Sequence, residues 1–305
     1  MKKLISLVFL CVFAACLTGC FSIKNQQEIT VKGPDLTAAK KVLQQKTQQL
    51  KMPKSQLPEV LGGVVYSDRW IVYKEKEEEE FEGNVSYDNG IYIFRAQYAL
   101  SQRKKNLFTA KDSVYIRKNE SAKSYYELYA DKAAYNYATG EGYAQANKKR
   151  RITLVYKNSQ GDLITALAQR ADFNTKEETY VLSGNVHVTH IDSLGKKSTL
   201  QADKISAKQK ENYALLQGNA IVQSQDYTLR SETIEYDGNQ KMAYAYGGRP
   251  LADGKTQEGT FAIIADKVSA ETDSHKIKLS GQVQGWIVSD QINNSKANES
   301  FDGSF

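Results

Sequence analysis

Cysteine is almost missing from this sequence of 305 residues. There are three, Cys11, Cys16 and Cys20, and all lie within the first twenty residues. A mature body that starts at Cys20 would have no thiol beyond that first residue. Disulfide bonds, thiolate metal sites and a cysteine nucleophile are therefore excluded from the folded part, which must be stabilised by its core and its backbone pairing.

Histidine is equally scarce, and no group of residues suits catalysis. The three histidines are His187, His190 and His275. The H-x-x-H spacing does not suggest a metal site, because residues three apart on a strand point to opposite faces. GKKS at 195–198 lacks the first glycine of a phosphate loop, and no G-x-S-x-G elbow is present. We predict no catalytic residues, no metal, no cofactor and no enzymatic activity.

Long hydrophobic runs are missing too, and the apolar stretch at 4–16 is too short to span a bilayer as a stable helix. It follows Lys2 and Lys3 and leads into LTGC at 17–20, which resembles a bacterial lipobox. The resemblance implies cleavage before Cys20 and acylation of that cysteine, which would anchor the protein to a membrane. The alternative is an ordinary secretory leader that happens to contain cysteines. We predict a lipoprotein signal peptide at 1–19.

The charge of the chain is nearly balanced. Without the two leader lysines, 39 basic side chains face 35 acidic ones, a net charge of +4. Such a charge favours solubility. No stretch combines a basic patch with a nucleic-acid-binding motif, so nucleic acid is not a predicted partner.

The rest of the chain divides into three parts. A polar segment at 20–59 reads as a lipid-anchored tether, in which 35–51 forms either a short helix or a flexible spacer. The body at 60–289 is rich in short runs of Tyr, Val, Ile and Thr, which predict strands. The tail at 290–305 is polar and predicted to be disordered. Turn dipeptides separate the predicted strands at Asn89-Gly90, Gln160-Gly161, Leu194-Gly195, Asp237-Gly238 and Asp253-Gly254.

One short pattern recurs within the body. YVLSGNVHV at 180–188 has near copies in FEGNV at 81–85, LQGNA at 216–220 and LSGQV at 279–283. Apolar and polar residues alternate through these copies, as in half-buried strands. A glycine inside a strand weakens it unless the backbone requires one. The recurring glycine therefore predicts a bulge, a sharp bend or a close backbone approach in each unit.

A second element recurs between these glycines. Its copies are Ala96-Gln97, Ala171-Asp172, Ala202-Asp203, Ser231-Glu232 and Ala265-Asp266. Three times the next glycine follows sixteen residues later, at Gly218, Gly247 and Gly281. A fixed spacing of this size is typical of stacked units that each need a neighbour to bury an apolar face. We interpret the carboxylates as strand-end or turn features.

These serial units resemble the OstA-like (organic solvent tolerance-like) domain, the type shared by LptA, LptC and the N-terminal part of LptD. The clearest text is ALLQGNAIVQSQDYTLRSETIEYDGNQKMAYAYGGRP at 214–250 and EGTFAIIADKVSAETDSHKIKLSGQVQ at 258–284. The resemblance is clear over 165–288 and weaker over 70–164, where Gly140-Glu141-Gly142 departs from the pattern and leaves the register open. It implies an all-β fold, an elongated twisted antiparallel β-jellyroll.

The resemblance also implies a function. Such rolls hold the acyl chains of lipopolysaccharide or a related glycolipid in an apolar groove and pass the lipid between the inner and outer membranes. The groove candidates are the recurring inward apolar residues, and each has plain core packing as its alternative. They are Phe81, Val85, Leu182, Val186, Val188, Leu216, Val222, Leu279, Val283 and Ile287.

Partners and location follow from the same resemblance. Other OstA-like proteins are expected to pair with the edge strands, predicted at 64–73 and 277–288. The protein is expected in the periplasm, anchored through Cys20 to the inner or the outer membrane. Two other roles remain open: an LptC-like receiver at an inner-membrane exporter, and a structural envelope lipoprotein that binds no lipid.

Overall fold

The computed structural model describes residues 64–147, 149–256, 259–271 and 276–289. Within these ranges the chain forms 20 strands and one 3-10 turn, and every strand pairing is antiparallel. No helix in the described part is long and apolar enough to cross a membrane. The predicted signal peptide with Cys20, the tether, the tail and His275 lie outside the described residues.

The strands follow one another with short connections. In chain order they are β1 (Val64–Tyr66), β2 (Arg69–Tyr73), β3 (Glu78–Asp88), β4 (Tyr92–Gln102), β5 (Leu107–Asn119), β6 (Tyr125–Asn136), β7 (Glu141–Gln145), β8 (Ile152–Lys157), β9 (Leu163–Ala168), β10 (Arg170–Asn174), β11 (Thr179–Ile191), β12 (Lys197–Lys208), β13 (Tyr213–Gln223), β14 (Tyr227–Asp237), β15 (Met242–Tyr246), β16 (Leu251–Thr256), β17 (Gly259–Ile264), β18 (Lys267–Glu271), β19 (Ile277–Ser280) and β20 (Gln284–Ser289), with the 3-10 turn η2 (Arg103–Lys105) between β4 and β5.

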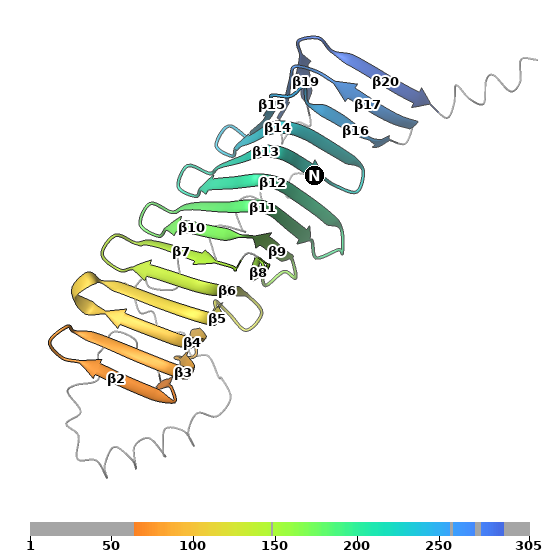
Figure 1. The fold of residues 1–305 in the computed structure, drawn as a ribbon. Helices are drawn as coiled ribbons and strands as arrows, with labels where there is room; N and C mark the ends of the chain where they lie inside the picture. Colours follow the sequence, from red (N-terminus) through yellow and green to blue (C-terminus); the bar gives the residue numbers. More distant parts are fainter. Residues whose placement is uncertain (1–63, 148, 257–258, 272–275, 290–305) are drawn as a thin grey trace, which may run out of the picture.

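Pairing along the chain builds two ladders, which we call the first and second half-sheets. The first runs β2-β3-β4-β5-β6-β7-β10-β11-β12-β13-β14-β15-β18-β19. The second runs β1-β3-β4-β5-β6-β8-β9-β11-β12-β13-β14-β16-β17-β20. The strands stack side by side along a long axis (Figure 1), which confirms the elongated antiparallel roll.

The long strands belong to both half-sheets because each of them is bent near its middle. The bend coincides with a shift in register, and the shifts fall at the same step in successive pairs. They lie between Glu82 and Val85, Arg95 and Tyr98, Lys111 and Val114, Ser183 and Val186, Gln201 and Lys204, and Gln217 and Ala220. We call the line that joins these shifts the seam.

Tight turns follow one another at regular intervals along the outer edge of the first half-sheet. Several hairpins close with four residues, and the last of the four is left-handed, as in Asn106 (φ 52°), Glu178 (φ 55°) and Asn212 (φ 50°). The first N–H of a turn donates to the last carbonyl of the preceding turn, for example from Gln209 to Glu178 at 2.9 Å. These bonds extend the ladder beyond the strand ends.

The predicted turns are confirmed with one exception. Gly90, Gly161 and Gly195 have positive φ in turns of the second half-sheet, and Gly238 opens the turn after β14. Asp253-Gly254 was expected to form a turn, but the pair lies inside β16. There a side chain on Gly254 would meet the carbonyl oxygen of Asp226 at 2.6 Å. This glycine serves a close approach of two backbones.

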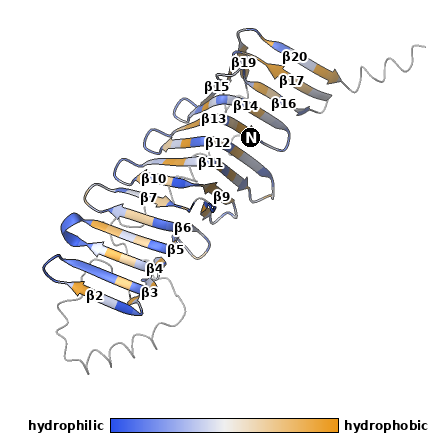
Figure 2. Ribbon diagram, viewed as in Figure 1, coloured by the Kyte–Doolittle hydropathy of each residue, from blue (hydrophilic) through white to orange (hydrophobic). Residues whose placement is uncertain are grey.

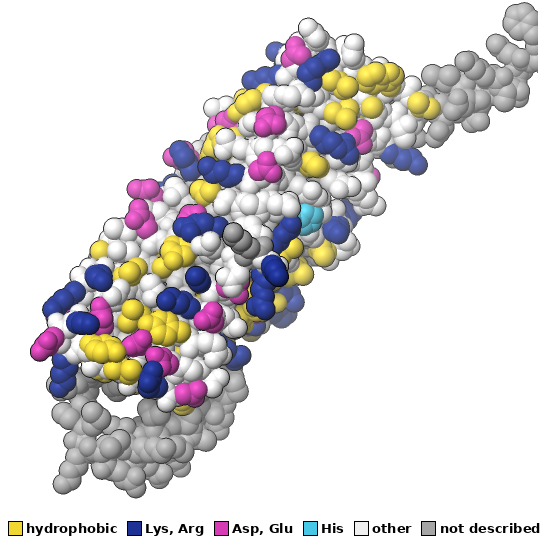
Figure 3. Space-filling model, in the orientation of Figure 1, with side chains coloured by type: hydrophobic (Ala, Val, Ile, Leu, Met, Phe, Trp, Pro, Cys, Tyr) yellow, Lys and Arg dark blue, Asp and Glu magenta, His cyan; other side chains and the backbone are white. Residues whose placement is uncertain are grey.

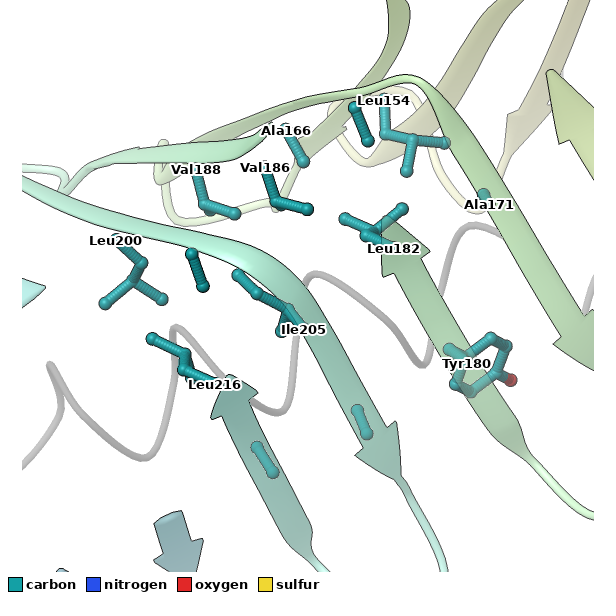
Figure 4. Packing of buried hydrophobic residues seen from close by; sticks show 14 of the residues in the cluster. Leu154, Ala166, Ala171, Tyr180, Leu182, Val186, Val188, Leu200, Ile205 and Leu216 are labelled. Atoms are coloured by element: carbon teal, nitrogen blue, oxygen red, sulfur yellow. The ribbon is translucent and has the colours of Figure 1, made fainter. Parts of the chain in front are cut away.

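The inward faces of the two half-sheets form the apolar interior (Figure 4). Its central cluster extends from Tyr126 to Val268 and includes Leu182, Val186 and Leu216, each no more than 1% exposed. Hydrophobic positions recur in strand after strand along the roll (Figure 2). The interior is therefore continuous along the axis, and no single strand pair provides it.

Candidate functional site

The seam explains the recurring glycine. Gly184 (φ +84°) and Asn185 (φ 51°) are both left-handed, a conformation that costs an ordinary residue free energy but not glycine. A side chain at Gly184 would also meet Cβ and Cγ of Gln169 at 2.6 Å, where the Gln169 N–H donates to the Ser183 carbonyl at 2.9 Å. The predicted bulge, bend and close approach all occur at this glycine.

A carboxylate takes the place of Gln169 beside three other seam glycines. A Cβ on Gly218 would lie 2.3 Å from Oδ2 of Asp203, and the Asn219 amide donates to that oxygen at 3.0 Å. Gly83 stands in the same relation to Asp68, and Gly281 to Asp266. The two elements of the sequence repeat thus meet across neighbouring strands, and the spacing of about sixteen residues reflects one hairpin.

Two interpretations of the repeat are corrected by this geometry. The carboxylates were expected at strand ends or turns. Asp266 does lie between β17 and β18, but Asp203 lies within β12, because that strand bends there without ending. Ala171-Asp172 was assigned to the repeat, but both residues pair within β10 with Leu182 and Val181. The seam position is held by Gln169.

The structure also gives the register over 70–164 that the sequence left open. In β5, Asp112 (φ 60°) and Ser113 (φ 57°) adopt the left-handed pair that Gly-Asn forms elsewhere. Opposite them lies Asp131 of β6. On the other side of β6, a loop between β7 and β8 takes the place of the bulge. In it the Asn147 N–H donates to the Asp131 carboxylate at 2.6 Å. The units therefore continue through the segment without a visible motif.

Left-handed pairs keep the inward face apolar on both sides of the seam. Leu182 and Val186 are four residues apart and both are buried. The two left-handed residues between them, Gly184 and Asn185, keep inward and outward side chains alternating across the bend. On the neighbouring strand, Ala202 and Ile205 are three apart and both buried, at 4% and 1% exposure. Each bent strand thus contributes apolar side chains to both half-sheets.

Most of the predicted groove residues line this interior. Phe81, Val85, Leu182, Val186, Val188 and Leu216 are buried, with 8% exposure at most, and Val222 and Leu279 are partly buried against the main cluster. Phe81 and Val85 belong to a smaller cluster with Ala99 near the first strands. Val283 and Ile287 are 49% and 74% exposed. Ile287 lies opposite Phe261, but no described strand lies beyond β20 to cover it.

The interior phenylalanine residues Phe94, Phe108 and Phe173 escaped the sequence reasoning. Phe94 and Phe108 contact each other edge to face, with ring centroids 5.4 Å apart. Tyr135 and Phe173 stack at 6.1 Å across β7. Gly142 makes room for them, because a Cβ there would meet the Phe173 ring at 2.4 Å. These aromatics lie outside the repeated text, and the Gly142 segment that seemed irregular was the signal for them.

Both ends of the roll expose apolar residues on edge strands. At the first end Tyr66, Trp70 and Val72 are 57%, 53% and 55% exposed. At the other end Trp286 and Val288 are 55% and 54% exposed. Among the described strands, β2 pairs only with β3, and β20 only with β17. Figure 3 shows hydrophobic side chains near both ends of this face, among charged residues of both signs that are spread over the whole face.

His187 and His190 lie on opposite faces of β11, as their spacing predicts. His190 is 2% exposed and faces the interior, where burial lowers its pKa and favours the neutral ring. The pKa of His187 is also lowered, by partial burial and by the nearby positive charges of Arg151 and Lys197. Within the described ranges no group of His, Cys, Asp and Glu residues is arranged to hold a metal ion.

Comparisons with known proteins give two matches. The family model described as "LptA/(LptD N-terminal domain) LPS transport protein" matches residues 64–213. Among solved structures, the chain is similar to LptH of Pseudomonas aeruginosa, described as the LptA homologous periplasmic component of the conserved lipopolysaccharide transport device. The identity is 12%, the TM-score is 0.33, and the match covers 40% of this chain and 82% of that one. No curated protein matches.

Proposed function

The chain belongs to the OstA-like family of lipopolysaccharide-transport proteins, and from this premise we propose that it holds the acyl chains of lipopolysaccharide, or of a related glycolipid, between its half-sheets. It passes this lipid between the inner and outer membranes by binding and release, without chemical change. The observation that supports this proposal is the continuous apolar interior. A channel for acyl chains needs an elongated, dry aliphatic surface, and each buried methylene contributes about 0.8 kcal/mol.

The polar part of the lipid stays outside the roll in this proposal. Charged side chains of both signs are spread over the face shown in Figure 3, so sugars and phosphates would meet water and polar groups there. The groove candidates with buried side chains, such as Val188 and Leu216, would contact the acyl chains. The exposed candidate Ile287 extends the inward row to the open end of the roll.

The exposed edges suit docking to other OstA-like proteins. An edge strand offers unpaired backbone groups to which a partner strand can add. The apolar exposure of Trp70 at one end and of Trp286 at the other favours partners at both ends. Rolls docked in this way would join their interiors into one path for lipid.

The anchor determines where along this path the protein acts. Acylation of Cys20, which the lipobox-like LTGC suggests, would tether the roll to the inner or the outer membrane and keep it in the periplasm. The same feature favours the LptC-like role as the second candidate, since a lipid anchor would hold the receiver beside an inner-membrane exporter.

Photo-crosslinking in living cells tests the interior and the edges together. A photoreactive amino acid at Val222, which faces the main cluster, is expected to form an adduct with lipopolysaccharide. The same residue at Ile221, the next position on the other face, should form none. Probes at Trp70 and Trp286 are expected to capture OstA-like partners. A structural lipoprotein would give no lipid adduct at Val222, and that result would overturn the proposal.

A further inference from the structure

A polar pair interrupts the apolar inward face of β11 and β12. His190 follows Val186 and Val188 on that face and lies directly opposite Ser198 of β12 and Ile164 of β9. His190 is 2% exposed and Ser198 is 7% exposed. The pair lies in the last inward row before the β11–β12 hairpin, at the rim of the second half-sheet.

Neither residue satisfies its hydrogen-bonding groups within the protein. Nδ1 and Nε2 of His190 and Oγ of Ser198 have no hydrogen-bond partner among the described residues. The nearby carboxylate of Asp162 is already engaged, since it accepts from the Ser193 N–H and from the Asn158 amide, both at 2.8 Å. Buried polar atoms without partners are rare and costly in folded proteins, so three in one place indicate a missing partner.

We propose that His190 and Ser198 bind a hydroxyl group carried on the acyl chain of the ligand, an inference that rests on the proposed function. A neutral imidazole has one donor and one acceptor, and a serine hydroxyl can do both. The group that complements this pair must both donate and accept hydrogen bonds at one atom, as the oxygen of an alcohol does. The ligand class is thus an amphiphile whose chain is hydroxylated close to its headgroup.

The surroundings of the pair fix the direction of such a chain. Lys196 and Lys197 come directly before Ser198 and are exposed at the rim. Together with Leu194, Gly195 and Gln225 they line an open recess on the surface. An anionic headgroup would lie at these ammonium groups, the hydroxyl at the polar pair, and the rest of the chain along Val188 and Val186.

Native mass spectrometry of the full-length chain with an equimolar mixture of 3-hydroxytetradecanoate and tetradecanoate tests this inference. The unmodified protein is expected to prefer the hydroxylated chain about five- to tenfold, which corresponds to one hydrogen bond of typical net strength. The double variant His190→Leu, Ser198→Ala is expected to bind both chains equally. The control His187→Leu, on the outer face of the same strand, should keep the preference.

The melting temperature of the lipid-free protein is a second readout, and it does not depend on how strongly either probe binds. Because the double variant removes unpaired polar groups from the interior, its melting temperature without lipid is expected to rise. Equal binding of both probes by the unmodified chain, or a preference that persists in the double variant, would overturn the inference and leave the proposed function intact. Binding of neither probe would count against both.

Discussion

Replacing Gly184 with valine is expected to lower the free energy of unfolding by about 2–5 kcal/mol. The left-handed backbone alone costs a residue with a side chain about 1–2 kcal/mol. A Cβ at this position would also lie 2.6 Å from Cβ and Cγ of Gln169, so the neighbouring strand must shift. Forced shifts of this kind add about 1–3 kcal/mol. Denaturant unfolding monitored by circular dichroism measures the change.

Gly195 supplies the matched control for this prediction. Its φ of +79° is close to that of Gly184, but nothing lies within 4 Å of the position of its Cβ. Gly195→Val should therefore cost only the conformational part, about 1–2 kcal/mol. Equal losses in the two variants would show that close approach at the seam contributes nothing.

Replacing Leu216 with aspartate is expected to destabilise the protein by more than about 4 kcal/mol. Leu216 is fully buried in the central cluster, and truncation of such a leucine already costs about 2–5 kcal/mol. The carboxylate would add the penalty of a polar group in an apolar interior. Thermal and denaturant unfolding of the variant measure the loss.

The control for the interior is the neighbouring residue on the same strand. Gln217 is exposed and points to the outer face, so Gln217→Asp is expected to change stability by less than about 1 kcal/mol. A large effect at Gln217 together with a small one at Leu216 would reverse the assignment of the two faces.

The sequence predicted those features of the fold that depend on residues close together along the chain. The alternation of Leu182, Gly184 and Val186 predicted a strand with an inward apolar face and a bend, and all three features are confirmed. The turns at Gly90, Gly161 and Gly195 followed from local backbone preferences. Local preferences also led to the wrong assignment of Gly254. The sequence alone does not distinguish a glycine that allows two backbones to approach closely from a glycine that forms a turn.

The features that sequence reasoning missed are properties of strand pairs. The partner of a seam glycine is identified only when the register is known, and Gln169, which belongs to no copy of the repeat, lies beside Gly184. In the weaker segment, Asp112 and Ser113 take the left-handed pair without glycine, since short polar residues tolerate this conformation. The family model matches residues 64–213 and so includes this segment.

The candidate site was predicted in outline from its periodicity. Burial of Leu182, Val186, Val188 and Leu216 agrees with the expected inward face. The polar pair of His190 and Ser198 could not be predicted. The alternation that places Val186 inside also places His190 inside, but whether the imidazole finds a hydrogen-bond partner depends on the neighbouring strands.

Glycolipid content is the measurement that most directly tests binding within the roll. The full-length Cys20→Ala variant, which lacks the predicted acylation site, would be purified from its own envelope fraction and extracted for mass spectrometry. We expect lipopolysaccharide or a related glycolipid to copurify with it. Protein that is folded, free of glycolipid and unable to take it up when supplied would contradict lipid binding and favour a structural role.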